Sequence, residues 1–208
     1  RTARFGRSLE VRAATGSTND DARAAAAAGA PDGHVVLADR QSAGRGAHGR
    51  RWDSPAGTDL YFSIVARVPL SPGRLPPLTL AVGLGVARAV AARVPTAEVT
   101  VKWPNDVLLD GRKVSGVLVE SASVGGRVES AILGIGLDVN RPRFGPELEP
   151  IATSLRRASG VCWDRGRVLA EVLESVERQV DRFIEHGTEA IVPGVEARLA
   201  FRGARVRC

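Results

Sequence analysis

Apolar positions along the chain fall into short runs and long runs. The short runs are bounded by glycine, proline or charged residues and predict buried strands over residues 34–38, 58–68, 98–102 and 107–109. A dense apolar run over 75–94 is long enough to predict a buried helix. Over 168–184, apolar residues recur at helical spacing with charged residues opposite, which predicts an amphipathic helix without chemistry of its own.

Two glycine-containing turns indicate how the later strands pair. Asp110-Gly111 lies between two apolar runs and is a strong signal for a tight hairpin. Gly125-Gly126 predicts a second turn, which leads into an apolar stretch over 128–139. Because hairpins place neighbouring strands antiparallel, we expect an α/β protein of the α+β kind, with a mixed, largely antiparallel sheet flanked by helices.

Residues 17–21, Ser-Thr-Asn-Asp-Asp, precede the alanine-rich stretch 22–28 and predict the start of a helix. Thr18 is the candidate cap, and Asp20 and Asp21 fall in the first turn, where acidic side chains interact well with the helix dipole. Helix capping alone would explain the residue types at 17–21, and binding of a ligand is the alternative explanation.

Size and composition limit the possible functions. The 208 residues, 21.9 kDa, suffice for one full domain and at most a fragment of another. The net charge of +6 is spread along the chain and is not interleaved with aromatic residues, so DNA binding is disfavoured. The two cysteines lack metal-ligand spacing, which fits a reducing cytoplasm. We also expect no apolar run long enough to cross a bilayer.

Lysine is rare in this chain, since only Lys102 and Lys113 are lysines among 29 Lys and Arg residues. An ammonium is a compact point charge and a guanidinium is a flat fork, so a site that contacts a phosphate and a carboxylate together can require lysine. The alternative is a general excess of arginine with two chance lysines. Lys113 follows the predicted tight turn, where its backbone is well fixed.

Residues 44–52, Gly-Arg-Gly-Ala-His-Gly-Arg-Arg-Trp, form a loop rich in glycine and arginine. Glycines let the backbone approach an anion closely, and arginines supply fixed positive charge. A dinucleotide-binding motif is disfavoured because the following Arg51-Trp52-Asp53-Ser54-Pro55 opens no apolar helix, and the chain has no P-loop sequence. The alternative is a solvated surface loop.

Four segments together resemble the successive signatures of biotin protein ligases: residues 44–52, 102–106, 113–116 and 134–140. The resemblance runs from about Thr15 to the C-terminus. It implies a biotin/lipoate ligase catalytic domain, similar to class II aminoacyl-tRNA synthetases, over residues 1–200. It also implies that residues 201–208 begin a truncated SH3-like module, and that no DNA-binding segment precedes the catalytic domain.

The resemblance also implies roles for single residues. Biotin contacts fall to Ser17, Thr18, Asn19, Gln41, Gly44, Arg45, Gly46, Lys113 and Gly116. ATP or adenylate contacts fall to Arg50, Trp52, Lys102, Asn105, Asp106, Lys113, Asp138 and Asn140. Lys113, Arg45 and Arg50 are the expected catalytic residues, and Asp106 is the candidate ligand for Mg²⁺.

The implied reaction has two steps. Biotin and ATP form biotinyl-5′-AMP, and the biotinyl group then passes to a lysine of a biotin carboxyl carrier protein. A homodimer is compatible with the resemblance. For Trp52, adenine stacking competes with a role as a loop anchor packed on the core. The alternatives to this function are a non-catalytic relative that binds biotin or nucleotide, and a lipoate ligase.

Two positions depart from the family's pattern. Ala47 stands where an arginine that helps hold the adenylate is common, so we expect leakier retention of biotinyl-5′-AMP. Asp138 stands where the first asparagine of Gly-x-Gly-x-Asn-x-Asn is usual. An anion at that position would repel phosphate unless it binds magnesium.

Overall fold

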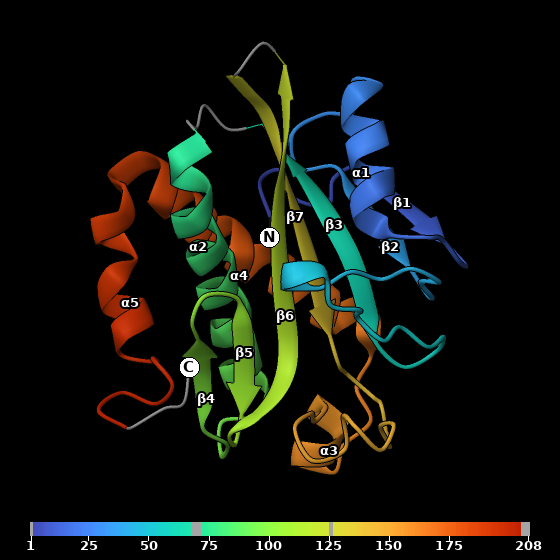
Figure 1. The fold of residues 1–208 in the computed structure, drawn as a ribbon, viewed down its shortest axis with the longest axis vertical. Coiled ribbons are helices and arrows are strands. Elements are labelled where there is room, and N and C mark those ends of the chain that lie inside the picture. Colours follow the sequence, from blue (N-terminus) through green and yellow to red (C-terminus); the bar gives the residue numbers. More distant parts are fainter. Residues whose placement is uncertain (1, 68–71, 125–126, 205–208) are drawn as a thin grey trace.

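A computed structural model describes residues 2–67, 72–124 and 127–204. Seven strands form one sheet in the order β1-β2-β3-β7-β6-β5-β4, and only the β1–β2 pair is parallel. The expected mixed, largely antiparallel sheet flanked by helices is therefore confirmed (Figure 1). The strands are β1 Leu9–Arg12, β2 Val35–Ala38, β3 Leu60–Ala66, β4 Val99–Lys102, β5 Asp106–Leu109, β6 Arg112–Val124 and β7 Arg127–Leu137.

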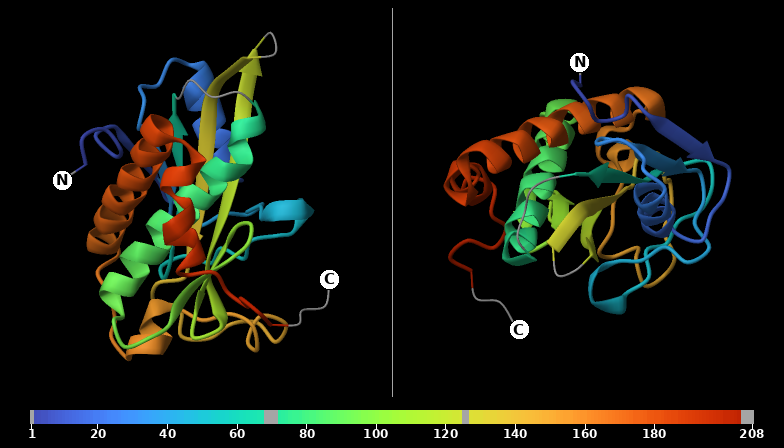
Figure 2. Two further views of the ribbon diagram at one scale, coloured as in Figure 1. Left: turned by 90° about the vertical axis from the view of Figure 1, so that its left-hand side faces the viewer. Right: turned by 90° about the horizontal axis from the view of Figure 1, so that it is seen from above.

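The helices are α1 Thr18–Ala27, α2 Leu75–Arg93, α3 Leu155–Ser159, α4 Arg165–His186 and α5 Val192–Glu196, with short 3₁₀ turns η1 Ala47–Gly49, η2 Pro72–Arg74 and η3 Thr188–Ala190. α2 and α4 cover one face of the sheet and α1 packs on the other (Figures 1 and 2). The larger core lies between the sheet and the α2–α4 layer, whereas a smaller cluster joins Ala22 and Ala26 of α1 to Val36, Val65 and Ile132.

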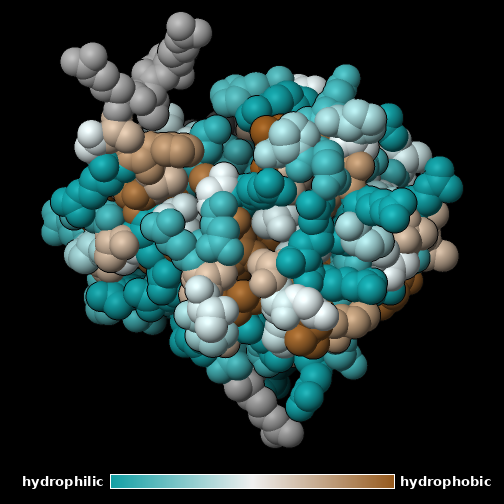
Figure 3. Space-filling model, turned by 90° about the horizontal axis from the view of Figure 1, so that it is seen from below, coloured by the Kyte–Doolittle hydropathy of each residue, from teal (hydrophilic) through white to brown (hydrophobic). Residues whose placement is uncertain are grey.

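Period-two alternation in β3 assigns its side chains to these two faces. Leu60, Phe62 and Ile64 point into the core beneath α2 and α4, and Ser63 lies between them in sequence, on the face that carries α1. The α1 face therefore carries Ser63 beside the apolar side chains of Val36, Val65 and Ile132, so it is polar only in part. From below, most of the molecular surface is hydrophilic, and apolar side chains reach it in small groups (Figure 3).

α2 requires a correction. Its 19 residues are long and apolar enough to cross a membrane, so the expectation that no apolar run reaches that length is wrong. Ten of its residues are buried, however, and Gly85 lets the helix approach α4 so closely that a Cβ there would lie 2.6 Å from Val176 Cα. The apolar surface of α2 is thus used in the core of this fold.

Other local predictions have mixed outcomes. Asp110 and Gly111 both adopt positive φ, 49° and 75°, as the predicted tight hairpin requires. β1, α3 and α5 were not predicted. The expected turn at Gly125-Gly126 lies outside the described residues. Of the expected start of a second module, residues 201–203 form a turn, and 205–208 also lie outside the described residues.

The prediction that Thr18 caps α1 is wrong. Ser17 occupies the N-cap position without a side-chain capping bond, and Thr18 is the first helical residue. Asp20 and Asp21 do lie in the first turn, as expected. The hydroxyl of Thr18 is used elsewhere, in the cavity described next, so capping does not explain the residue types at 17–19.

Candidate functional site

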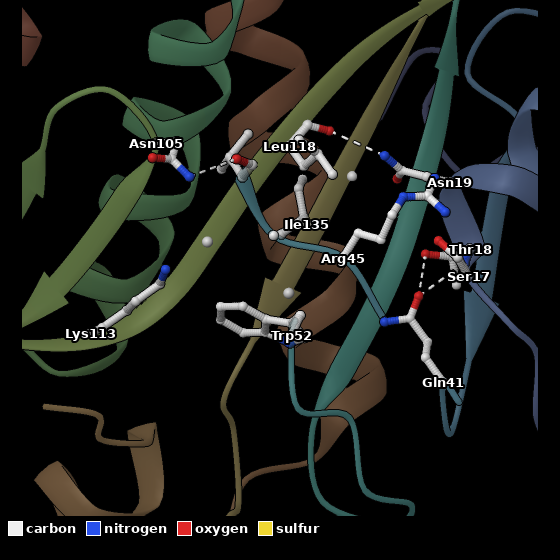
Figure 4. A pocket seen from close by; sticks show the side chains of 15 residues that line it. Ser17, Thr18, Asn19, Gln41, Arg45, Trp52, Asn105, Lys113, Leu118 and Ile135 are labelled. Atoms are coloured by element: carbon white, nitrogen blue, oxygen red, sulfur yellow. Dashed lines mark hydrogen bonds between the residues drawn. The ribbon is translucent and has the colours of Figure 1, made fainter. Parts of the chain in front are cut away.

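A small cavity lies on the α1 face of the sheet, between the start of α1 and strands β6 and β7 (Figure 4). Its volume is about 30 Å³, and it is lined by Ser17, Thr18, Asn19, Gln41, Arg45, Gly46, Trp52, Asn105, Lys113, Gly116, Val117, Leu118, Gly134, Ile135 and Gly136. Segments that are distant in sequence thus meet here, as the resemblance implied. Their ligand contacts stay predictions.

Glycines form the floor of this cavity for steric reasons. Gly116 of β6 pairs directly with Gly136 of β7, and Gly134 lies two residues further along the same face. A Cβ at Gly134 would stand 2.2 Å from Asn19 Oδ1, and one at Gly136 would stand 2.4 Å from Trp52 Cε2. Any larger residue would therefore displace the side chains that line the cavity.

One end of the small cavity carries a buried hydrogen-bond network. Gln41 Oε1 accepts from the Thr18 N–H at 2.9 Å and lies 3.2 Å from its hydroxyl, while Gln41 Nε2 donates to Ser54 Oγ at 3.0 Å. The Ser63 hydroxyl lies within 2.8 Å of Thr18 Oγ1 and 2.6 Å of Asn19 Oδ1. Donors and acceptors are thus prearranged at this end.

Lys113 lies at the opposite end of the cavity (Figure 4). Its backbone is held on both sides, because its N–H donates to Ile151 O and its carbonyl accepts from Thr153 N–H, each at 2.8 Å. The Nζ atom lies 2.7 Å from Asp106 Oδ1 and 5.2 Å from the centre of the Trp52 ring. The ammonium is therefore positioned by an ion pair and an aromatic face.

A larger cavity of about 390 Å³ opens on the other side of Lys113. Its polar and charged lining includes Arg50, Arg51, Asp53, Lys102, Asp106, Asp138 and Arg141. Gly46, Trp52 and Lys113 line both cavities. One ammonium thus stands where a small cavity with a polar end meets a larger cavity in which cationic side chains outnumber acidic ones.

Apolar residues that sequence reasoning missed also line the larger cavity. They are Phe144, Leu148, Pro150 and Ile151 of the segment between β7 and α3, together with Phe201. Their only signal was the apolar character of Phe144, Leu148 and Ile151 within a Pro-rich connection. Apolar walls beside cationic groups suit a ligand with a flat aromatic part and a phosphate part.

Trp52 is an anchor of the glycine-rich loop. Its indole packs on Gly116 and Gly136, where added Cβ atoms would fall 2.8 Å and 2.4 Å from the ring, and its Nε1 is buried without a hydrogen-bond partner in the described part of the chain. The anchoring alternative is therefore supported. The ring still lines the larger cavity, so adenine stacking stays a prediction.

Arg45 lies across the small cavity, away from the larger one. Its guanidinium makes a two-pronged contact with Asp20, at 2.6 and 2.7 Å, which is the main reason that the pKa of Arg45 is raised and that of Asp20 is lowered. Arg50 is exposed, and both Arg50 and Ala47 line the larger cavity. Of the two expected catalytic arginines, only Arg50 faces the cationic cavity in this structure.

Asp138 is fully buried at the floor of the larger cavity. Burial, and after it the nearby Asp59 carboxylate, raises the pKa of Asp138 well above its ordinary value. Arg141 is directed mainly to other acids, with Nε 2.9 Å from Asp59 Oδ2 but 3.7 Å from Asp138 Oδ1. The raised pKa makes Asp138 easier to protonate than an ordinary carboxyl group, and a protonated Asp138 would resemble asparagine and would not repel phosphate.

Three predicted residues differ from expectation. Asn140 lines neither cavity, because its side chain both donates to Trp163 O and accepts from Trp163 N–H at 2.8 Å. Asn105 lines the small cavity, with Nδ2 donating to Val117 O, and does not line the larger one. Gly44 lines neither, but a Cβ there would lie 2.6 Å from Trp52 O, so it allows the base of the loop to close.

A largely antiparallel seven-stranded sheet flanked by helices, with two cavities that share Lys113, places this chain among α/β proteins with the biotin protein ligase fold. The structure matches that of the Aquifex aeolicus biotin protein ligase in complex with biotin and ATP with a TM-score of 0.81 and 32% identity, covering 94% of this chain and 79% of the other.

Sequence comparison gives the family. Residues 14–138 match the biotin/lipoate A/B protein ligase family, and the chain belongs to that family. It is 39% identical to the Mycobacterium tuberculosis biotin--[acetyl-CoA-carboxylase] ligase over 97% of this chain and 74% of the relative. It is 36% identical to the Bacillus spizizenii bifunctional ligase/repressor BirA over 90% of this chain. The chain spans little more than half of the Bacillus relatives, 58% and 53%.

Proposed function

We propose that this protein is an ATP-dependent ligase that forms biotinyl-5′-AMP and transfers the biotinyl group to a lysine of a biotin carboxyl carrier protein. The observation that supports this most strongly is the position of Lys113 at the junction of the two cavities. A carboxylic acid in one cavity and a nucleotide in the other would meet at this ammonium.

The small cavity suits the chemistry of biotin. The ureido group needs both donors and acceptors, and the buried network of Gln41, Thr18 and Asn19 offers both. The glycine floor adds no side chains to the cavity, but the volume of about 30 Å³ is smaller than a bicyclic ring, so the lining side chains must move aside before the ring can bind with its valerate chain toward Lys113. A carboxylate would thereby lie next to the ammonium.

The first step brings two anions together. A carboxylate oxygen of biotin attacks the α-phosphorus of ATP, the bond to the β-phosphate oxygen breaks, and pyrophosphate leaves. Lys113 reduces the repulsion and stabilises the charge on the α-phosphate oxygens, while Arg50 and Lys102 contact the outer phosphates from the larger cavity. In the second step, a carrier lysine amine attacks the acyl carbon and AMP leaves.

Magnesium fits this site as part of the nucleotide complex. In the described residues, no group of three or more His, Cys, Asp or Glu side chains could hold a metal. Asp106 lines the larger cavity and could serve as one ligand, but its Oδ1 is paired with Lys113 Nζ at 2.7 Å, so a metal would have to use the other oxygen or replace that ion pair. Mg²⁺ commonly binds through one or two carboxylates plus substrate phosphates, and would supply further charge neutralisation when bound.

The proposal includes the cellular compartment and the oligomeric state of the protein. The surface thiol of Cys162 is free, which fits a reducing cytoplasm. A homodimer stays a prediction.

Calorimetric titration with biotin and with lipoate, followed by pyrophosphate release with ATP, tests the proposal. We expect biotin to bind, lipoate to bind far more weakly, and pyrophosphate to appear only when both biotin and ATP are present. Tighter binding of lipoate would make the protein a lipoate ligase. Biotin binding without biotin-dependent pyrophosphate release would make it a non-catalytic binding protein.

A further inference from the structure

β1 forms one outer edge of the sheet, at the right of Figure 1. It pairs with β2 alone, so in the described part of the chain no strand lies on its other side. The opposite edge differs, because Val101 of β4 donates to Arg198 O and accepts from the Ala200 N–H, at 2.7 and 2.9 Å. The C-terminal segment thus covers β4, whereas β1 presents a free edge, which natural sheets usually protect or pair.

The parallel pairing with β2 decides which backbone groups of β1 are free. Ser8 O and Arg12 O both accept from backbone N–H groups at or next to the ends of β2, each at 2.9 Å. Alternate residues of a strand bond to the same neighbour, so Leu9 and Val11 direct their N–H and C=O groups away from β2. A strand added at this edge would therefore form hydrogen bonds with Val11 at its centre.

The side chains of β1 divide into a charged pair and an apolar pair. Glu10 and Arg12 lie on the α1 face, where Arg12 contacts Asp21 of α1 at 2.9 Å. Leu9 and Val11 lie on the opposite face and are 48% and 65% exposed. The free edge thus carries one acid and one base on one face, and two large apolar side chains on the other.

An apolar groove of about 500 Å³ lies next to these apolar side chains. Its mainly apolar lining joins Val11 and Ala13 to Leu37 of β2, Leu60 of β3 and Leu169 of α4. It shares no lining residue with either cavity of the candidate site. The ligase chemistry therefore gives this groove no role.

A second copy of β1 fits the free edge in one register. An antiparallel copy related by a two-fold axis at Val11 pairs Val11 with Val11 of the copy, through the outward N–H and C=O groups of both. Glu10 then lies opposite Arg12 of the copy, and Arg12 lies opposite its Glu10.

Other registers are disfavoured. A shift by two residues sets Glu10 against Glu10 or Arg12 against Arg12, and like charges directly opposite are destabilising. A shift by one residue leaves the outward groups of Val11 without aligned partners. The charges of β1 and the direction of its free backbone groups thus select the same register.

We propose that β1 is the interface of a homodimer, in which two copies pair their β1 strands antiparallel about a two-fold axis at Val11. In this register Leu9 of the second copy lies beside Ala13, where its side chain covers the apolar groove. One short strand per copy makes a small interface, so we expect a weak dimer whose population depends on concentration. The homodimer of the proposed function thereby gains a defined interface, and the ligase chemistry plays no part in it.

The test is sedimentation equilibrium of the full chain over a wide range of concentration, with charge reversals on β1. Glu10→Arg and Arg12→Glu each turn both cross-strand pairs into like-charge pairs, so either variant alone should dimerise at least about tenfold more weakly than the parent. An equimolar mixture of the two variants should form a heterodimer at least as tight as the parent dimer, because both cross-strand pairs again join opposite charges.

This complementation distinguishes an interface from a structural role, because a variant with a damaged fold would not regain association from a differently substituted copy. Val11→Pro is a second disruptive variant, since it removes an outward N–H and no hydrogen bond to β2. It should also weaken the dimer. Glu196→Arg is the matched control, because it reverses an exposed charge on α5, on the other side of the molecule from β1 (Figure 1), and it should dimerise as the parent does.

Three results would overturn the interface. They are a parent that stays monomeric at every concentration, a dimer that persists in both charge reversals and in Val11→Pro, and charge reversals that remain monomeric when mixed. Biotin-dependent pyrophosphate release is measured separately. Its absence would refute the proposed ligase activity and leave the interface standing, whereas failure of the interface would leave the ligase activity standing.

Discussion

Adding one methyl group to the cavity floor, by Gly136→Ala, should displace the side chain that separates the two cavities. The new Cβ would lie 2.4, 2.5 and 2.7 Å from Cε2, Nε1 and Cζ2 of Trp52, whereas ordinary van der Waals contacts are 3.4–4 Å. The indole must therefore shift by about 1 Å or leave the floor. Overpacking of this kind costs about 1–3 kcal/mol, or roughly 2–12 °C in Tm for a chain of this size.

The assay combines thermal unfolding with biotin-dependent pyrophosphate release. Since Trp52 lies 5.2 Å from Lys113 Nζ, its displacement should lower kcat/KM for ATP in addition to Tm. Gly83→Ala is the control, because a Cβ there meets nothing within 4 Å and alanine favours a helix interior by about 0.5–1 kcal/mol. It should keep or raise Tm at parental activity.

A double-mutant cycle identifies the cause. If the methyl group acts through the indole, Gly136→Ala should cost little further stability in a Trp52→Ala background. An equal loss of stability in both backgrounds, or parental Tm and activity for Gly136→Ala alone, would refute this reasoning.

Three further predictions concern other parts of the site. Ala47→Arg should slow release of biotinyl-5′-AMP on the order of 10- to 100-fold, from a charged hydrogen bond of about 1.5–3 kcal/mol, and an unchanged residence time would dismiss leaky retention. Burial, and after it the Asp59 carboxylate, raises the pKa of Asp138, so the stability that this acid contributes is full below the ordinary value of 3.8 and is lost as pH rises through the raised value. The Tm of Asp138→Asn relative to that of the parent should therefore increase with pH. A difference in Tm that does not change with pH would contradict this. Asn140→Ala should lose about 2–4 kcal/mol by leaving the N–H and carbonyl of Trp163 unpaired, and a higher KM for ATP at parental Tm would return Asn140 to the nucleotide site.

Much of the fold follows from local signals in the sequence. The Asp110-Gly111 turn and the apolar runs on either side fix the β5–β6 hairpin, which brings Lys113 to the start of a strand. β1 was missed because its four residues carry no apolar run and its side chains are only partly buried at the edge of the sheet. Its pairing with β2 depends on tertiary contacts.

The sequence predicted which residues lie near the cavities where a motif fixes their place on a strand, helix or loop. It did not predict the hydrogen bonds and ion pairs that side chains form with residues distant in sequence. The residues at 17–19 look like a helix cap, yet Thr18 turns to Gln41 and Ser63, which are distant in sequence. Arg45 was expected to contact biotin and to act in catalysis, but its pairing with Asp20 and Glu120, which hold it over the small cavity, was not foreseen. Local pattern cannot show this, since it depends on how α1, β6 and the loop meet.

The central claim is that the ammonium of Lys113, fixed where the two cavities meet, allows a carboxylate and an α-phosphate to react. The most direct measurement is biotinyl-5′-AMP formation by Lys113→Ala at saturating biotin and ATP, with Arg167→Ala, which removes an exposed charge from α4, as the control. We predict a loss of about 10²–10³-fold for Lys113→Ala and a parental rate for the control. Formation of the adenylate by Lys113→Ala at the parental rate would contradict the account.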